Sequence, residues 1–275
     1  MPTSTIRHPA VAGRFYPREP EILRKEVASY LSHAESAKQE SIRALGCIAP
    51  HAGYMYSGPV AGAVFARLQI PTRVVLLCPN HTGMGRPLAV MSDGEWETPL
   101  GSVRINTALA GSLKQRFPAL QEDSAAHRAE HAAEVELPFL LLRQPQLTFV
   151  PIALGTGQFE PLQQLGEALA DVIAARKEDV LIVASSDMNH YESDAVTRVK
   201  DHRAIERILS LDPRGLYDVV TQQDISMCGF GPAVAMLMAA TRLGAKSAEL
   251  VKYATSGDVS GDRDMVVGYA GIVVR

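Results

Sequence analysis

Residues 73–81 read RVVLLCPNH, a run of apolar residues that ends in a proline, an asparagine and a histidine. A continuous apolar run of this length is typical of a strand buried on both faces, which requires helices on both sides of the sheet. Two further runs have the same form, CIAPH at residues 47–51 and IVASSDMNH at residues 182–190. The sequence therefore predicts an α/β fold in which three buried strands each lead into a turn that carries a histidine: His51, His81 and His190.

The pattern around these strands extends the same architecture over the chain. Apolar runs predict strands at residues 44–49, 73–78, 88–92, 147–153, 180–185, 248–254 and 265–274. Helical spacing of apolar residues predicts helices at residues 20–40, 58–68, 107–116, 131–143, 161–176, 194–209, 213–222 and 231–243. No helix separates the last two strands, so part of the sheet is expected to be antiparallel. Because no repeat, low-complexity tract or linker interrupts the chain, we predict a single domain over residues 1–275, with a mostly parallel or mixed central sheet flanked by helices.

Composition narrows the class of protein. The chain has 27 Lys and Arg against 30 Asp and Glu, a net charge of −3, and no basic run, which argues against a nucleic-acid binder. Three widely spaced cysteines do not make a disulfide framework and fit a reducing compartment. We find no signal-peptide pattern at the start, and the longest apolar stretch, residues 233–240, is too short to span a bilayer. The sequence thus favours a cytoplasmic protein without a membrane partner.

Candidate site residues gather at the predicted strand ends. In open α/β sheets, ligands bind beyond the carboxyl ends of the strands, so the three histidines are expected to converge there. Asp187 precedes His190 by three residues and could orient an imidazole, hold a proton, or simply cap the next turn. Cys228 lies just before a predicted helix, where a thiol is expected to have a lowered pKa and to act as a metal ligand or a nucleophile.

Other residues receive a structural interpretation. Cys47 and Cys78 lie inside apolar strands, where buried and inert thiols are usual. Glu130 precedes the helix predicted at residues 131–143 and Glu134 lies near its start, where acidic side chains favour the helix dipole. The arrangement of Glu134 three residues after His131 reverses the Glu-x-x-His order of known metal pairs.

Several of these segments form an ordered set. They are PHAGY (50–54), PNH (79–81), Glu130-His131 with Glu134, SSD (185–187) with His190, MCG (227–229) and YATSGD (253–258). In this order they resemble the Memo family, and in bacteria and archaea the AmmeMemoRadiSam system protein B. The resemblance spans nearly the whole chain. It implies a fold similar to that of class III extradiol ring-cleaving dioxygenases, which use non-haem Fe(II).

The resemblance also implies roles for individual residues. His51, His81 and Cys228 would be the metal ligands, and Asp187 and His190 the neighbouring catalytic residues, with His190 as the acid/base. The dioxygenases hold iron with two histidines and a carboxylate, whereas the third ligand here would be a thiolate. Such a set is softer and suits copper or zinc as well as Fe(II), so cleavage of catechols does not follow from the fold.

Three functions are open at this point. The first is a metal-dependent redox protein that uses Fe(II) or copper, with His190 as general acid/base, Asp187 orienting it, and an unknown small-molecule substrate. The second is a non-enzymatic scaffold whose cleft binds a peptide or protein partner, because eukaryotic relatives resemble signalling adaptors; the name of the bacterial system implies a radical-SAM partner by association. The third, a hydrolase with Cys228 as nucleophile, ranks last because no nucleophile-elbow motif is present.

Overall fold

The computed structural model describes residues 5–35 and 41–275, and twelve strands within them form one mixed sheet. The centre of the sheet is parallel and has the order β6-β8-β3-β9-β2. These strands are β6 (Gly101–Ile105), β8 (Thr148–Leu154), β3 (Arg73–Pro79), β9 (Leu181–Ser185) and β2 (Gly46–Ala49). Because β3, β9 and β2 are parallel neighbours, their carboxyl ends lie at one edge of the sheet.

Antiparallel strands flank this parallel centre. On one side β12 (Val266–Val274) pairs with β2, with β11 (Ala248–Thr255) and with the short β10 (His190–Glu192). On the other side β5 (Glu95–Thr98) pairs with β6 and is joined in parallel by β1 (Ile6–Arg7), while β4 (Leu88–Val90) pairs with β8 and with β7 (Gln121–Glu122). The predicted mixed sheet is confirmed, and its last two strands form one of its antiparallel parts.

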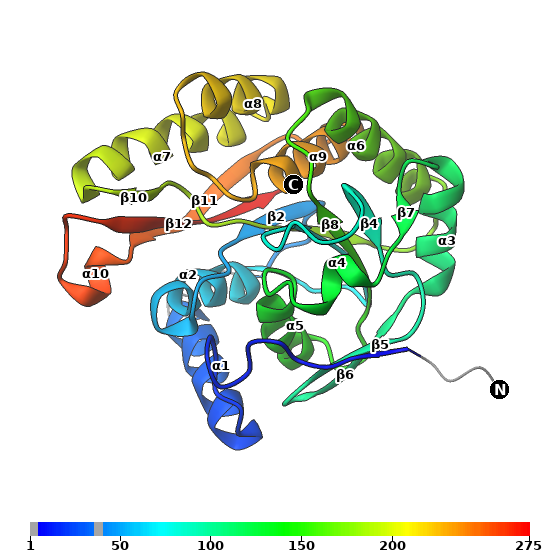
Figure 1. Ribbon diagram of the computed structural model, residues 1–275, viewed down its shortest axis with the longest axis horizontal. Helices are drawn as coiled ribbons and strands as arrows, with labels where there is room; N and C mark the ends of the chain where they lie inside the picture. Colours follow the sequence, from blue (N-terminus) through cyan, green and yellow to red (C-terminus); the bar gives the residue numbers. More distant parts are fainter. Residues whose placement is uncertain (1–4, 36–40) are drawn as a thin grey trace.

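Helices cover both faces of the sheet (Figure 1). One face carries α1 (Pro20–Glu35), α2 (Tyr54–Arg67) and α5 (Leu137–Arg143). The other carries α3 (Thr107–Arg116), α6 (Phe159–Ala174), α7 (Asp194–Leu209), α8 (Pro213–Gln222) and α9 (Phe230–Arg242). Along β3, Val75 and Leu77 enter one hydrophobic core and Val74 and Leu76 the other, and all four are fully buried. Each such side chain contributes roughly 1.5–3 kcal/mol of transfer free energy, which explains the continuous apolar run at residues 73–78.

The predicted elements are confirmed with local corrections. Each predicted strand is present within two residues of its expected ends. The helix predicted at residues 131–143 begins only at α5, after a 3-10 turn at Glu134–Glu136, because Glu130 and Glu134 use their carboxylates in tertiary hydrogen bonds. The helix α2 begins at Tyr54 instead of residue 58, and the helix predicted at residues 20–40 ends in the described part at Glu35; residues 36–40 lie outside it.

Several short elements were not predicted, among them one hairpin and two helices. The hairpin of β5 and β6 was missed because β5 alternates buried and half-buried residues over only four positions. The short helices α4 (Ala125–Arg128) and α10 (Gly257–Ser260) are too brief to produce a periodic pattern. Among the helices in the described ranges, none combines the length and the hydrophobicity needed to cross a bilayer.

Candidate metal centre

The three predicted histidines lie at one edge of the sheet, around one cavity of about 600 Å³. His51 follows β2, His81 follows β3, and His190 opens β10 shortly after β9 ends. The order β3-β9-β2 places these three strand ends side by side. The same cavity is lined by Asp187 and Cys228, so the structure brings together all five residues that the sequence singled out.

The imidazole of His51 is held in one tautomer. Its Nδ1 lies 2.8 Å from Ser185 Oγ, which in turn lies 2.7 Å from the carbonyl oxygen of Ala132. Because a carbonyl only accepts, Ser185 donates its single proton there and accepts from His51 Nδ1–H. The lone pair is therefore on Nε2, which lies 3.2 Å from Cys228 Sγ. Burial, reinforced by the neighbouring histidines, holds the pKa of His51 well below its usual value, so the ring is neutral.

A buried carboxyl group completes this chain of hydrogen bonds. Glu136 is fully buried, and its Oε1 lies 2.9 Å from Ser185 Oγ. Burial raises the pKa of Glu136 well above its usual value, and the nearby Asp187 adds to the effect. A neutral Glu136 can donate to Ser185, whose own proton is already committed to the carbonyl of Ala132. The direction of every bond from Glu136 to His51 is then consistent.

His81 is fixed by Glu130. The backbone N–H of His81 donates to Glu130 Oε2 at 2.6 Å, and its ring Nδ1 lies 2.9 Å from Oε1. The N–H of Ala132 also donates to Oε1, at 2.9 Å. Burial raises the pKa of Glu130, but the hydrogen bonds from His81 and Ala132 outweigh burial and bring it below its usual value. A carboxylate only accepts, so Nδ1 of His81 carries the proton and Nε2 carries the lone pair.

A further imidazole, that of His131, lies against this pair. The rings of His81 and His131 stack with centroids 4.7 Å apart and planes at 19°. Nδ1 of His131 lies 3.5 Å from Glu130 Oε1, so both rings share one carboxylate. His131 also lines the cavity, edge-on to His51 at 5.5 Å.

Cys228 reaches the site from the loop before α9. A Cβ on the next residue, Gly229, would lie 2.3 Å from the carbonyl oxygen of Ser185 and 2.4 Å from Ser186 Cβ. Only glycine therefore allows this loop to pass so close to the end of β9.

The expectation of a lowered thiol pKa at Cys228 is wrong. Burial raises the pKa of Cys228 well above its usual value, and the charge of Asp187 acts in the same direction. The thiol precedes the helix and its N-cap Gly229, so the cost of desolvating a thiolate exceeds the influence of the helix dipole. A bound cation reverses this balance, because a thiol that coordinates a metal is deprotonated.

Two groups of donor atoms in the described part of the chain have the spacing of metal ligands. Nitrogen or sulfur atoms of His51, His81 and Cys228 all lie within 4.8 Å of one another. Donor atoms of His81, Glu130 and His131 form a second group with the same spacing. Since Nδ1 of His81 is bonded to Glu130, Nε2 is the ring nitrogen whose lone pair is available to a metal ion.

Asp187 and His190 have different hydrogen-bond partners from those expected. Asp187 is buried and accepts the backbone N–H of His51 at 2.7 Å, so it supports the turn after β2. Burial raises its pKa to about 7, although the backbone N–H groups of His51 and Ala52 oppose this. The ring of His190 is held by Ser226, whose carbonyl oxygen lies 2.8 Å from Nδ1. The proton is therefore on Nδ1, and burial lowers the pKa of His190, which leaves Nε2 as a base.

The N-terminal segment forms one wall of the cavity. The ring of Phe15 lies against His131 with centroids 4.7 Å apart. Glu134, which is fully buried, fixes this segment by accepting hydrogen bonds from four donors: Arg7, the backbone N–H groups of Ala10 and Val11, and the Tyr16 hydroxyl. These hydrogen bonds hold the segment that carries Phe15 at the wall of the cavity.

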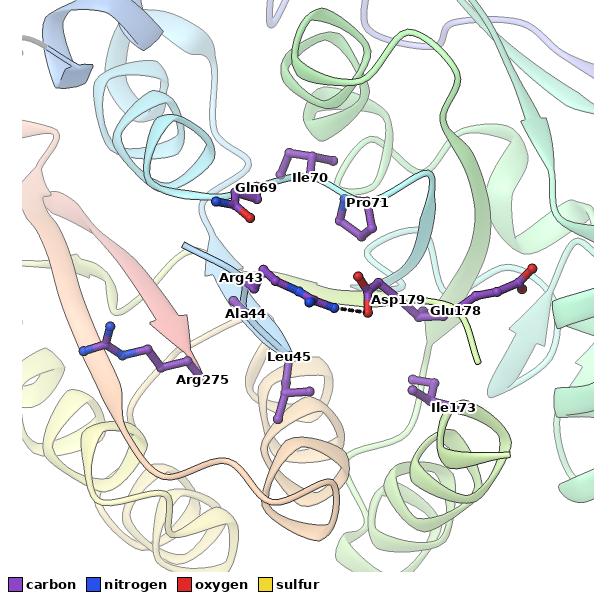
Figure 2. A pocket seen from close by; sticks show the side chains of 11 residues that line it. Arg43, Ala44, Leu45, Gln69, Ile70, Pro71, Ile173, Glu178, Asp179 and Arg275 are labelled. Atoms are coloured by element: carbon purple, nitrogen blue, oxygen red, sulfur yellow. Dashed lines mark hydrogen bonds and ion pairs between the residues drawn. The ribbon is translucent and has the colours of Figure 1, made fainter. Parts of the chain in front are cut away.

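A second hollow, of about 550 Å³, lies at the opposite edge of the sheet, where β2, β3 and β9 begin (Figure 2). Its prominent polar contact is the ion pair of Arg43 with Asp179. Neither histidine nor cysteine is among the described residues that line it. Both its place in the fold and its chemistry separate it from the cavity of His51 and Cys228.

Sequence reasoning missed residues that contact and orient the histidines of the site. Glu130, His131 and Ser226 lie outside strands and helices, and no short motif describes a residue that acts through another one. The adjacency of Glu130 and His131 was the available signal. It was assigned to a helix start, and the structure has no helix at that position.

The fold and the site together define a class of protein: an α/β domain with a His/His/Cys cluster at the carboxyl edge of its parallel strands. Comparison with known proteins gives the family. The model of Memo-like proteins matches residues 7–273, and the chain belongs to this family.

Relatives agree with this assignment, and a solved structure has a similar fold. A MEMO1 family protein of Methanopyrus kandleri is 43% identical over 279 residues, which cover 98% of this chain and 99% of the relative. A MEMO1 family protein of Methanothermobacter thermautotrophicus is 41% identical over 273 residues, covering 96% and 99%. The fold is similar to that of an uncharacterized protein from Escherichia coli K12, with a TM-score of 0.57 and 14% identity, over 84% of this chain and all of the other.

Proposed function

We propose that this Memo-family chain binds a redox-active metal ion, Fe(II) or copper, through Nε2 of His51, Nε2 of His81 and Sγ of Cys228. The observation that carries the proposal is that one donor atom from each of these three residues lies within 4.8 Å of the other two. Each histidine has its other ring nitrogen occupied by a hydrogen bond, to Ser185 and to Glu130. Both Nε2 lone pairs are therefore available to one ion.

The separation of the donor atoms of His51 and Cys228 fits the bond lengths of such an ion. Metal–imidazole and metal–thiolate bonds of about 2.0 and 2.3 Å allow one ion to bridge atoms up to about 4.3 Å apart. The distance from His51 Nε2 to Cys228 Sγ is 3.2 Å, within that reach. Three protein ligands leave a coordination position open, as in catalytic sites, and the cavity provides space beside it. A His₂Cys set suits copper and Fe(II), and also zinc.

His190 is the proposed acid/base of a metal-dependent oxidoreductase. Its proton is held on Nδ1 by Ser226, so Nε2 can take a proton from a ligand in the cavity. Asp187 positions the turn that carries His51. A bound iron or copper ion supplies Lewis acidity and one-electron exchange with the substrate. The similarity to class III dioxygenases, the AmmeMemoRadiSam type with its radical-SAM partner, and a cytoplasmic location are part of this proposal and rest on the sequence resemblance.

A second function is supported by the rim of the cavity. Tyr191 is 71% exposed and lines the opening together with Phe15, which gives the cleft an apolar edge for a peptide or protein partner. In this alternative the chain is a scaffold that keeps the cleft without catalysis. The raised pKa of Cys228 argues against a hydrolase with a free thiolate nucleophile.

The test is the metal content of the full chain purified without oxygen, measured by elemental analysis. We expect near-stoichiometric iron or copper in the wild type and its loss in His51→Ala and in Cys228→Ser. The controls are His202→Ala, at an exposed histidine of α7, and Cys47→Ala, at a buried cysteine of β2; both are expected to retain the metal. A wild type that holds negligible metal, and takes up none on reconstitution, would refute the metal centre and favour the scaffold.

A further inference from the structure

The sheet alone does not fix the orientation of the proposed acid/base. His190 is the first residue of β10, which has three residues and pairs only with β12 in the described part of the chain. The next residue, Tyr191, has φ 60°, in the left-handed region, and the pairing shifts register between His190 and Glu192. Such irregularities interrupt the ladder of main-chain hydrogen bonds. The orientation of the His190 ring therefore depends on contacts outside the ladder.

Ser226 makes the contacts that fix the His190 ring. The backbone N–H of His190 donates to Ser226 Oγ at 2.8 Å, and Nδ1 donates to the carbonyl oxygen of Ser226, also at 2.8 Å. Because a carbonyl only accepts, this contact selects the tautomer with the proton on Nδ1 and the lone pair on Nε2. Ser226 itself lies in a loop, two residues before Cys228, so its own position requires a support.

Asn189, directly before His190, provides that support. This side chain is fully buried, and its Oδ1 accepts two hydrogen bonds from Ser226, one from the backbone N–H and one from Oγ, both at 3.1 Å. Its Nδ2 donates to Glu192 Oε2 at 2.7 Å and lies 3.3 Å from Thr197 Oγ1. Since a backbone N–H only donates and a carboxylate only accepts, the two ends of the amide cannot be exchanged.

The backbone of Asn189 is fixed as well. Its N–H donates to Asp201 Oδ1 at 2.8 Å, and its carbonyl oxygen accepts from the N–H of Gly268 at 2.9 Å. Asp201 belongs to α7 and Gly268 to β12, so Asn189 joins a helix to the sheet. Moving the residue would leave several buried polar groups without partners, which is costly. Asn189 is therefore a rigid support for the loop of Ser226.

We propose that Asn189 is a positioning residue of this site: through Ser226 it selects the His190 tautomer whose Nε2 can accept a proton in the cavity. This inference rests on the role of His190 as the acid/base of the proposed function. It also connects two parts of the site through one amide, because Ser226 lies in the loop that carries Cys228. Loss of the Asn189 acceptor releases Ser226, and with it the ring of His190.

The test is the ratio of the two His190 tautomers, measured from the ring-nitrogen chemical shifts of the metal-free full chain at neutral pH. His190→Gln assigns the signals. We expect the Nδ1–H form to dominate in the wild type, and Asn189→Ala to lower the ratio of Nδ1–H to Nε2–H about fivefold, as the loss of one hydrogen bond allows. The matched control is Asn106→Ala, which removes an asparagine with two side-chain hydrogen bonds beside the start of β8 and should leave the ratio unchanged.

A second set of variants separates positioning from stability. Asn189→Asp keeps an acceptor for Ser226 but places a carboxylate against that of Glu192. It should therefore lower the thermal midpoint without changing the tautomer ratio. Adding Glu192→Gln restores a donor opposite the new carboxylate and should recover part of the midpoint.

The outcomes separate this inference from the proposed function. A ratio that is unchanged in Asn189→Ala, or that falls as far in Asn189→Asp, overturns the role of Asn189. If Asn189→Ala does not fold, Asn189→Ser, with a side chain too short to reach Ser226, gives the same comparison. The ratio is measured without metal, so the metal content of the wild type is an independent result. A wild type without metal but with the expected ratios would refute the metal centre and still support the positioning of His190 by Asn189.

Discussion

Replacing Glu130 with glutamine should weaken metal binding while the three proposed ligands stay in place. The Glu130 carboxylate is fully buried and accepts three hydrogen bonds, from the backbone and ring of His81 and from the backbone of Ala132. Glutamine has one accepting oxygen. If that oxygen keeps the bonds at the Oε1 position, the amide NH₂ faces the N–H of His81, and the turn that carries the ligand must shift.

The expected loss of metal affinity can be estimated from this geometry. Removing the carboxylate that orients a ligating histidine lowers metal affinity about 10–100-fold, which corresponds to roughly 1.4–2.8 kcal/mol. The assay is a competition titration of the metal-free chain with Co(II) against a chelating indicator. Glu97→Gln is the matched control, because Glu97 pairs with His8 at 2.6 Å on the surface, far from the cavity in the sheet order. If Glu130→Gln binds Co(II) within twofold of the wild type, the role assigned to Glu130 is refuted.

Three other perturbations test the surroundings of the site. Gly229→Ala forces a Cβ against the backbone of β9, so it should lower the free energy of unfolding by about 1–3 kcal/mol and reduce the amount of bound metal. The control Gly111→Ala, in open space on α3, should instead raise the free energy of unfolding by about 0.5–1 kcal/mol. Equal effects of the two variants in urea unfolding would contradict the close approach at Gly229. Glu134→Ala leaves the charge of the buried Arg7 without its carboxylate partner and should lower the free energy of unfolding by about 3–5 kcal/mol. The segment before α1 should then be cleaved faster by a protease. An unchanged cleavage rate would show that Glu134 does not fix this segment. Asp201 has a pKa raised from 3.8 to about 6 by burial, so the stability that its protonated form contributes is complete below about pH 4 and is lost as the pH rises through 6. Asp201→Asn lacks this loss, so its free energy of unfolding relative to the wild type should increase by about 3 kcal/mol from pH 4 to 7; a constant difference would contradict the raised pKa.

The centre of the fold could be predicted because burial on both faces leaves a distinct pattern in the sequence. The strand β3 packs into two cores at once, so its run of apolar residues has no polar interruption. Elements with one polar face, or with only a few residues, gave no such signal. The hairpin at residues 95–105 has alternating burial, and β10 is three residues long with a strained residue in its middle.

For the site, residues that end strands were predictable and residues that act through them were not. The topology places the carboxyl ends of parallel neighbours together, which is why His51, His81 and His190 could be grouped from the sequence. The pairing of His81 with Glu130 joins segments 49 residues apart, and the sequence contains nothing that specifies it. The pKa of Cys228 was predicted with the wrong sign because burial, which dominates it, depends on the loop held by Gly229.

The position of β12 in the sheet has a consequence for folding during synthesis. This strand closes one side of β2 and provides the edge on which β10 lies, yet it is the last strand to leave the ribosome. At about 5–20 residues per second, the 84 residues from the one after His190 to the end of β12 take about 4–17 s to synthesise. During that interval β2 has an unpaired edge and His190 has no strand to lie against. The side of the cavity that contains His190 is therefore completed only after β12 has been synthesised.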